Sequence, residues 1–183
     1  MEKIYSDGQA RAIGVSNYAV RHLEELVGVA EVMPMVNQVE LVRIPPHPTT
    51  THARAVSHDA SCKPSALKLR GCPQHTRLSQ PALRDYCAEH GIVVTAYSPL
   101  SGADLDDPAI TAIADAHGVG AGAVILRWLR QHGCAVLPKS LTPSRIADNL
   151  TVPASFQLTD AEMAKLDSLD EGLRINADAE LIV

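Results

Sequence analysis

Aromatic residues and long apolar runs are both scarce in this sequence. Only 3% of its 183 residues are aromatic, which leaves few of the stacking platforms on which proteins hold single-stranded bases. No apolar run approaches the roughly 20 residues of a membrane-spanning helix. With a net charge of −5 and a pI of about 5.9, the chain also lacks the polybasic character of nucleic-acid and membrane-surface proteins. We therefore expect neither a nucleic acid nor a membrane as partner.

Cysteine is sparse as well, and the common leader and dinucleotide motifs are missing. The four cysteines follow no regular spacing, which suits a reducing compartment. The first eight residues, MEKIYSDG, are charged rather than apolar, so they do not form a signal peptide. No GxGxxG fingerprint occurs, which argues against a Rossmann site. We expect a cytoplasmic α/β protein.

A cluster of cysteine and histidine in the first half of the chain raises the question of a zinc site. The candidates are Cys62, Cys72, His47, His52, His58 and His75. Their spacing fits neither a CxxC nor an HxxxH template, so we expect no metal. The other two cysteines, Cys87 and Cys134, and the single tryptophan, Trp128, are expected to pack in the core.

Four short apolar runs, each ending in polar residues, alternate with segments of helical period. The runs are residues 12–17, 35–41, 92–100 and 135–140. Short apolar runs bounded by glycine, proline or asparagine are typical of buried strands, and strand–helix alternation indicates parallel pairing. Parallel strands place the polar residues that follow them at one shared edge. Because a closed barrel of this kind needs eight such units and about 250 residues, we expect half of one.

Amphipathic spacing predicts helices between and after these strands. The predicted segments are residues 18–30, 81–90, 108–117 and 121–132, with two more helices starting at 143 and 160. Thr142 and Pro143 form a typical helix start, with threonine as N-cap and proline at the first helical position. Thr159 and Glu162 have the spacing of a capping box.

Residues 42–74 break this alternation. The segment has neither helical nor strand period, is rich in proline and carries a net positive charge in an acidic chain. A structureless connection of this length is unusual inside a compact domain, and its composition predicts disorder. We interpret it as an insertion and hypothesise that it is translated from a retained intron. Transcript reads that never splice at this junction would contradict that origin.

Several motifs, in order and with consistent spacing, resemble one known family. The motifs are GQARAIGVSN at 8–17, VNQVEL at 36–41, PALRDYCAEHGIVVTAYSPL at 81–100, VILRWL at 124–129 and VLPKSLTPSRIADNL at 136–150. They resemble the carboxyl-terminal half of the aldo-keto reductases. The resemblance implies a partial (β/α)8 TIM barrel, strands five to eight, as a single partial domain over residues 1–183. It also implies NADPH as cofactor and reduction of aldehydes or ketones.

The resemblance assigns the nicotinamide end of the cofactor to the first two strands. Ser16 and Asn17 of the GVSN motif and Gln38 of the NQ motif are expected to hold the carboxamide. Asn and Gln side chains offer both donors and acceptors, which a planar amide requires. Polar capping at strand ends is the structural alternative for these residues.

The third strand is expected to contribute the middle of the same site. In the AYSPL motif the resemblance places Tyr97 against the nicotinamide ring. Ser98 and Leu100 are expected to lie along the pyrophosphate. A purely packed aromatic is the alternative for the tyrosine.

A phosphate site is expected after the fourth strand. The resemblance assigns the adenosine 2′-phosphate to Lys139, Ser140, Arg145 and Asn149. The residues support this independently, because the helix start at 142–143 offers free N–H groups and a positive dipole end. Two cations near it favour NADPH over NADH, although solvated surface charges remain the alternative.

The family's catalytic tetrad of Asp, Tyr, Lys and His lies on the first four barrel strands, and no residue of this sequence matches those positions. His117 belongs to a predicted outer helix and is not a catalytic candidate, so we expect no catalytic residue here. Three hypotheses follow: a reductase represented in part, a catalytically silent NADP(H)-binding module, or a non-functional truncated product. We expect a small carbonyl substrate if the barrel is completed, and possible self-association through open sheet edges.

Overall fold

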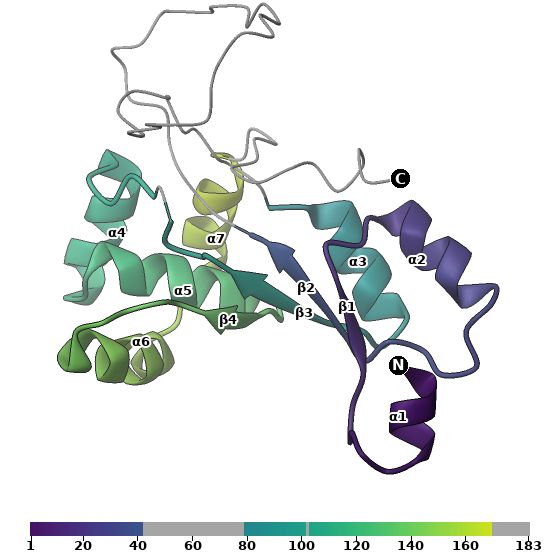
Figure 1. Ribbon diagram of the computed structural model, residues 1–183. Coiled ribbons are helices and arrows are strands. Elements are labelled where there is room, and N and C mark those ends of the chain that lie inside the picture. Colours follow the sequence, from purple (N-terminus) through teal and green to yellow (C-terminus); the bar gives the residue numbers. More distant parts are fainter. Residues whose placement is uncertain (42–78, 102, 170–183) are drawn as a thin grey trace, which may run out of the picture.

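The computed structural model describes residues 1–41, 79–101 and 103–169 (Figure 1). Four strands form one parallel sheet: β1 (Gly14–Ser16), β2 (Val36–Glu40), β3 (Val93–Tyr97) and β4 (Ala135–Leu137). They lie in the order β1-β2-β3-β4. The predicted parallel α/β architecture is therefore confirmed. The predicted insertion at 42–74, with the cysteines and histidines considered for zinc, lies outside the described residues.

Seven helices are described, and six of them match predicted segments. They are α1 (Glu2–Ser6), α2 (Val20–Val27), α3 (Pro81–Glu89), α4 (Pro108–His117), α5 (Ala121–Gln131), α6 (Pro143–Ser155) and α7 (Asp160–Asp167). In Figure 1, α2 and α3 are seen to the right and α4 to α7 to the left. Buried side chains of α2, α3, α4, α5 and α7 belong to one core cluster, so these helices pack on the same face of the sheet. The short α1 was not predicted, because none of its residues is buried and it has no apolar face.

The first strand is shorter than the predicted run 12–17. Its pairing with β2 begins with the hydrogen bond from the Met35 N–H to the Ile13 carbonyl oxygen, at 2.8 Å. The preceding residue, Pro34, has no N–H to donate, so the ladder does not extend toward residue 11.

The two faces of the sheet differ in character, because side chains alternate along each strand. One face contributes Val39, Val94 and Ala96 to the hydrophobic core beneath the helices. Residues of the opposite face include Val93 and Leu137, which are 49% and 48% exposed. The second face is thus open at these two positions, whereas Glu40 and Thr95 on the same face are 2% and 9% exposed. This face carries the polar side chains that follow in the site below.

Side chains of the helical layer bear out the predicted core. Trp128 is 1% exposed, and its indole Nε1 donates to Asp167 Oδ1 at 2.8 Å, which ties α5 to α7. Cys87 and Cys134 are buried, free thiols. Burial raises the pKa of Cys134 to about 11, so this thiol stays protonated and acts as a packing residue.

Within the described ranges, no single helix is long and apolar enough to cross a membrane. Helices α4 and α5 reach that length and composition only together, and they are bent by 90° at the break between them. Ile110 of α4 and Ile125 of α5 are both fully buried in the hydrophobic core.

Three predicted helix starts differ in how their N-cap side chains bond, and one of them makes no capping bond. Asp107 caps α4, because its Oδ1 accepts from the N–H groups of Ala109 and Ile110 at 2.7 and 3.2 Å. Thr159 and Glu162 form the predicted capping box of α7. Thr142 occupies the predicted N-cap of α6, but its side chain makes no capping bond.

Asp107→Ala is expected to lower the free energy of unfolding by about 1–2 kcal/mol, since it removes both capping bonds from a buried helix start. Thr142→Ala is the matched control and is expected to change stability by only a few tenths of that, about 0.3 kcal/mol. Urea denaturation followed by circular dichroism measures both. Equal losses for the two variants would contradict this account.

Gly14 allows the close approach of β1 to β2. A Cβ added at this position would lie 2.5 Å from the carbonyl oxygen of Val36 and 3.0 Å from its Cβ. Those atoms belong to the neighbouring strand, so they cannot move without disturbing the pairing.

Gly14→Ala is therefore expected to destabilise the protein by about 1–3 kcal/mol, the usual cost of overpacking. Gly28→Ala serves as control, because its added Cβ meets only an ordinary contact of 3.5 Å with the Glu25 carbonyl oxygen. The control is expected to be neutral or stabilising by up to about 1 kcal/mol. Thermal melts compare the two, and an unchanged melting temperature for Gly14→Ala would refute the steric argument.

Candidate functional site

The predicted nicotinamide residues come together where β1 ends. Ser16 Oγ donates to the Gln38 carbonyl oxygen at 3.0 Å, and the Asn17 N–H donates to the same oxygen at 2.9 Å. Ser16 is also directly opposite Gln38 in the register of β1 and β2. One backbone oxygen of β2 thus holds both Ser16, the last residue of β1, and Asn17, which follows it. The Gln38 side chain belongs to the face away from the core.

Asn17 has a left-handed backbone conformation, with φ of +58°. Asparagine adopts this conformation more readily than other residues with a side chain. The chain turns sharply here, directly between the end of β1 and the loop into α2. This turn sets the direction of the Asn17 side chain.

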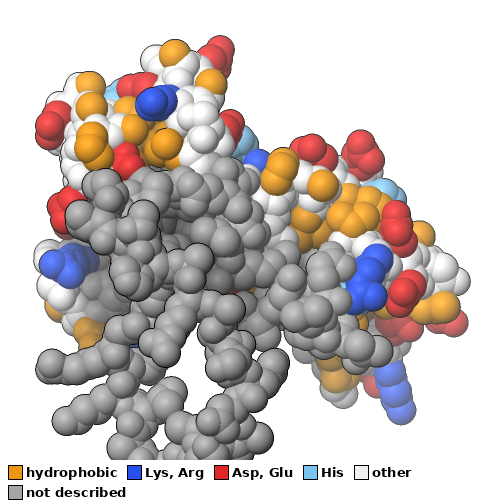
Figure 2. Space-filling model, turned by 90° about the horizontal axis from the view of Figure 1, so that it is seen from above, with side chains coloured by type: hydrophobic (Ala, Val, Ile, Leu, Met, Phe, Trp, Pro, Cys, Tyr) orange, Lys and Arg blue, Asp and Glu red, His pale blue; other side chains and the backbone are white. Residues whose placement is uncertain are grey.

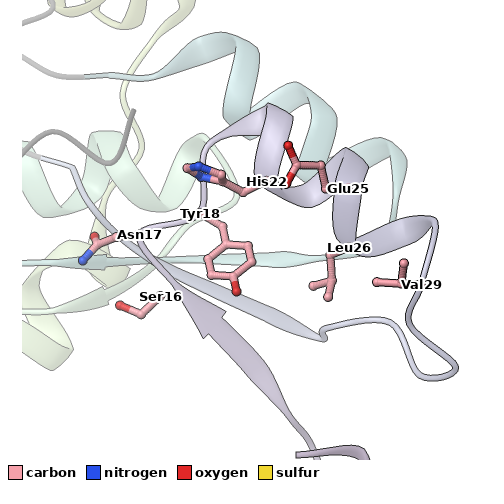
Figure 3. A pocket seen from close by; sticks show the side chains of 7 residues that line it. All are labelled: Ser16, Asn17, Tyr18, His22, Glu25, Leu26 and Val29. Atoms are coloured by element: carbon pink, nitrogen blue, oxygen red, sulfur yellow. The ribbon is translucent and has the colours of Figure 1, made fainter. Parts of the chain in front are cut away.

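A cavity of about 520 Å³ lies between the end of β1 and α2. Figure 3 shows its lining: Ser16, Asn17, Tyr18, His22, Glu25, Leu26 and Val29. The Tyr18 ring, Leu26 and Val29 give it an apolar side along the helix (Figure 3). Gln38 does not line this cavity. The cavity therefore extends from Ser16 and Asn17 toward α2, on the β1 side of the sheet.

The end of β3 supplies the predicted middle of the site. Tyr97 is opposite Glu40 and Leu137 in the register. Glu40 is two residues after Gln38 in β2, so Tyr97 lies on the same face of the sheet as Gln38. Ser98 follows with a left-handed φ of +52°. The side chain of Leu100 packs against α5, where a Cβ on Gly122 would lie 3.6 Å from its Cδ1. The side chain of Leu100 therefore serves packing.

The predicted phosphate residues surround the start of α6. Ser140 Oγ accepts a hydrogen bond from the Thr142 N–H at 3.2 Å, which shapes the turn before the helix. Lys139 and Arg145 are exposed, and neither has an ion-pair partner in the part of the chain that the structure describes. Asn149 lies one turn after Arg145 and lines a groove of about 400 Å³ between β4 and α6.

His117 lies away from these residues, as expected of an outer helix. Its Nε2 contacts Glu162 Oε1 at 2.9 Å, joining α4 to α7. Burial opposes ionisation of Glu162, but hydrogen bonds from Thr159 and His117 outweigh it and lower the pKa of this carboxyl from its ordinary value of 4.5. The pair is a helix–helix contact.

One buried polar residue next to the site was missed by sequence reasoning. Asn37 precedes Gln38 and is 0% exposed. Its side chain hydrogen-bonds both backbone groups of Tyr18. The sequence could have indicated this role, because Asn37 is a polar residue on the core face of its strand. A buried polar group requires hydrogen-bond partners.

Together the predicted residues form a row along the carboxyl edge of the sheet. The row runs from the loop after β1, across β2 and β3, to the start of α6, about 14 Å across four strands at the usual spacing. Amide and hydroxyl groups lie at one end and two cations with a helix start at the other. This donor set fits a dinucleotide with a carboxamide at one end and a phosphate at the other. Figure 2 shows acidic, basic and hydrophobic side chains mixed over the described surface seen from above.

Comparison with known proteins identifies the family of the chain. The model of the aldo/keto reductase family matches residues 1–171. The chain belongs to the aldo-keto reductase family. It is 39% identical over 181 residues to glyoxal reductase of Bacillus subtilis and 40% identical over 191 residues to morphine 6-dehydrogenase of Pseudomonas putida. Each match covers nearly all of this chain, 98% and 97%, and 53% of the relative.

Solved structures of the family share the fold. An aldo-keto reductase from a Medee basin deep-sea metagenome library matches with a TM-score of 0.76 and 29% identity, over 100% of this chain and 57% of that one. A Bombyx mori aldo-keto reductase in complex with NADP matches with a TM-score of 0.74 and 27% identity, over 98% of this chain and 51% of that one. The chain thus spans about half the length of the relatives it matches.

Proposed function

We propose that this chain is the NADP(H)-binding half of an aldo-keto reductase barrel, strands five to eight of eight. The single observation that supports it best is the row of polar and cationic groups along one sheet edge. When bound, NADPH supplies the hydride for reduction of an aldehyde or ketone. This chain's own residues bind and orient the cofactor.

Each end of the row has a separate task in this proposal. Ser16, Asn17 and Gln38 hold the carboxamide, and Tyr97 lies against the ring beside them. Lys139 and Arg145, with the N–H groups at the start of α6, hold the 2′-phosphate. Ser98 and Leu100 border the pyrophosphate, while Ser140 and Asn149 complete the phosphate end.

Carbonyl reduction also requires a proton donor, and the proposal assigns none to this chain. The family's acid tyrosine and its partners match no residue here. The chain by itself is therefore proposed to bind NADPH without turnover, with a small carbonyl compound as substrate of the completed barrel. Relatives named glyoxal reductase and morphine 6-dehydrogenase support that substrate class.

Lys139→Ala and Arg145→Ala are each expected to weaken NADPH binding by about 10- to 100-fold, the usual effect of losing a charged hydrogen bond. NADH binding is expected to change little, because NADH lacks the 2′-phosphate. Fluorescence titration of the full chain measures both affinities.

Lys165→Ala is the matched control for these variants, because Lys165 is exposed on α7 and lies outside the predicted row. Its affinity for both nucleotides is expected to equal that of the parent chain. Equal loss of NADH and NADPH binding in the Lys139 and Arg145 variants would count against the phosphate assignment. Failure of the parent to bind either nucleotide would refute the proposed function.

The open face and the two edge strands support a further element of the proposal, self-association. In the described sheet, β1 and β4 each pair with one neighbour, and edge strands with free backbone groups pair readily with other chains. Leu137 is half exposed on β4, and Leu141, just beyond the strand, is 91% exposed. Pairing between copies of this chain would cover these edges.

The parent chain is expected to elute above its monomer mass of 19.6 kDa in size-exclusion chromatography. Leu137→Lys is expected to shift elution toward the monomer, because a lysine on an edge strand disfavours pairing. Leu141→Lys adds the same charge outside the strand and is expected to have less effect. A parent chain that elutes cleanly as a monomer at all concentrations would rule out self-association.

A further inference from the structure

The side chain of Asn37 is wholly buried on the core face of β2. Its Nδ2 donates to the Tyr18 carbonyl oxygen at 2.9 Å, and its Oδ1 accepts from the Tyr18 N–H at 3.4 Å. The Asn37 side chain thus provides hydrogen-bond partners for both the N–H and the carbonyl oxygen of Tyr18, which belongs to no strand.

These bonds act on the residue next to Tyr18. Asn17 has a left-handed φ of +58°, a conformation that persists only where its surroundings hold it. From one side, the Gln38 carbonyl oxygen accepts from the Asn17 N–H at 2.9 Å. From the other, Asn37 holds both polar backbone groups of Tyr18.

Adjacent residues of β2 therefore restrain the same turn, Gln38 through its backbone carbonyl within the sheet and Asn37 through its side chain on the core face. Side chains at 37 and 38 point to opposite faces because they are consecutive in a strand. Gln38 provides its side chain to the open face and its carbonyl to the loop. Asn37 reaches the loop from the helix side.

We propose that Asn37 is a positioning residue for NADP(H): its amide clamps the backbone of Tyr18 and thereby fixes the direction of the Asn17 side chain at the nicotinamide end of the site. Asn37 does not touch the cofactor. The inference rests on the proposed function, since it assumes that Asn17 meets the carboxamide. It predicts an effect confined to one end of the dinucleotide.

The first test compares two ligands on the full chain with Asn37→Leu, which keeps the branching at Cγ and removes both hydrogen bonds to Tyr18. NADPH affinity is expected to fall about 10-fold, since poor positioning weakens the carboxamide contacts. Affinity for adenosine 2′,5′-bisphosphate, which occupies only the phosphate end, is expected to stay within about 2-fold of the parent. If Asn37→Leu does not fold, Asn37→Ala replaces it.

Val39→Ala is the matched control. Val39 is 2% exposed on the same strand and the same face, two residues further on, and its aliphatic side chain packs in the core and cannot hydrogen-bond the loop. Its loss is expected to lower stability without changing the ratio of the two affinities. Unchanged NADPH binding in Asn37→Leu, or equal loss of both ligands, would overturn the inference.

A second measurement does not depend on binding. Hydrogen exchange of the amides at 16–18 is expected to speed up at least 10-fold in the Asn37 variant relative to Val39→Ala, since the clamp on Tyr18 is lost. Unchanged exchange overturns the clamp. If the parent chain binds no NADPH, the proposed function fails, and the exchange result alone then decides whether Asn37 restrains the turn.

Discussion

Parallel pairing of four short strands is the constraint on which the rest of this structure depends. Because every strand runs in the same direction, every carboxyl end lies at the same edge of the sheet. Residues distant in sequence, such as Ser16 and Gln38, become direct neighbours through that register. The alternation along each strand then gives one face to the helices and leaves the other to polar groups.

The positions of the candidate site residues follow largely from this parallel pairing. A single carbonyl oxygen of Gln38 organises the loop after β1. At the far end, Lys139 precedes α6 and Arg145 lies in its first turn. We propose that both ends hold one cofactor, and the structure describes how the sheet separates them.

Much of this was predictable from particular residues. Proline at 81, 108 and 143 marked three helix starts, and the spacing of Thr159 and Glu162 marked a fourth. Other details were not predictable. Helix α1 has no apolar period, and Glu2 links it to residues 31 and 32 through hydrogen bonds that no local pattern reveals. Thr142 has the residue type of a cap, yet its side chain leaves the helix uncapped.

The sequence by itself determined the alternation of strands and helices, the order of the motifs and the chemical types along the carboxyl edge. Those properties depend on local periodicity and on residue identity, which a single chain displays directly. Only the tertiary structure decided which of two adjacent polar residues faces the open side and which clamps the loop. The register between β1 and β2 sets that choice, because a shift of one residue would exchange Asn37 and Gln38 between the faces.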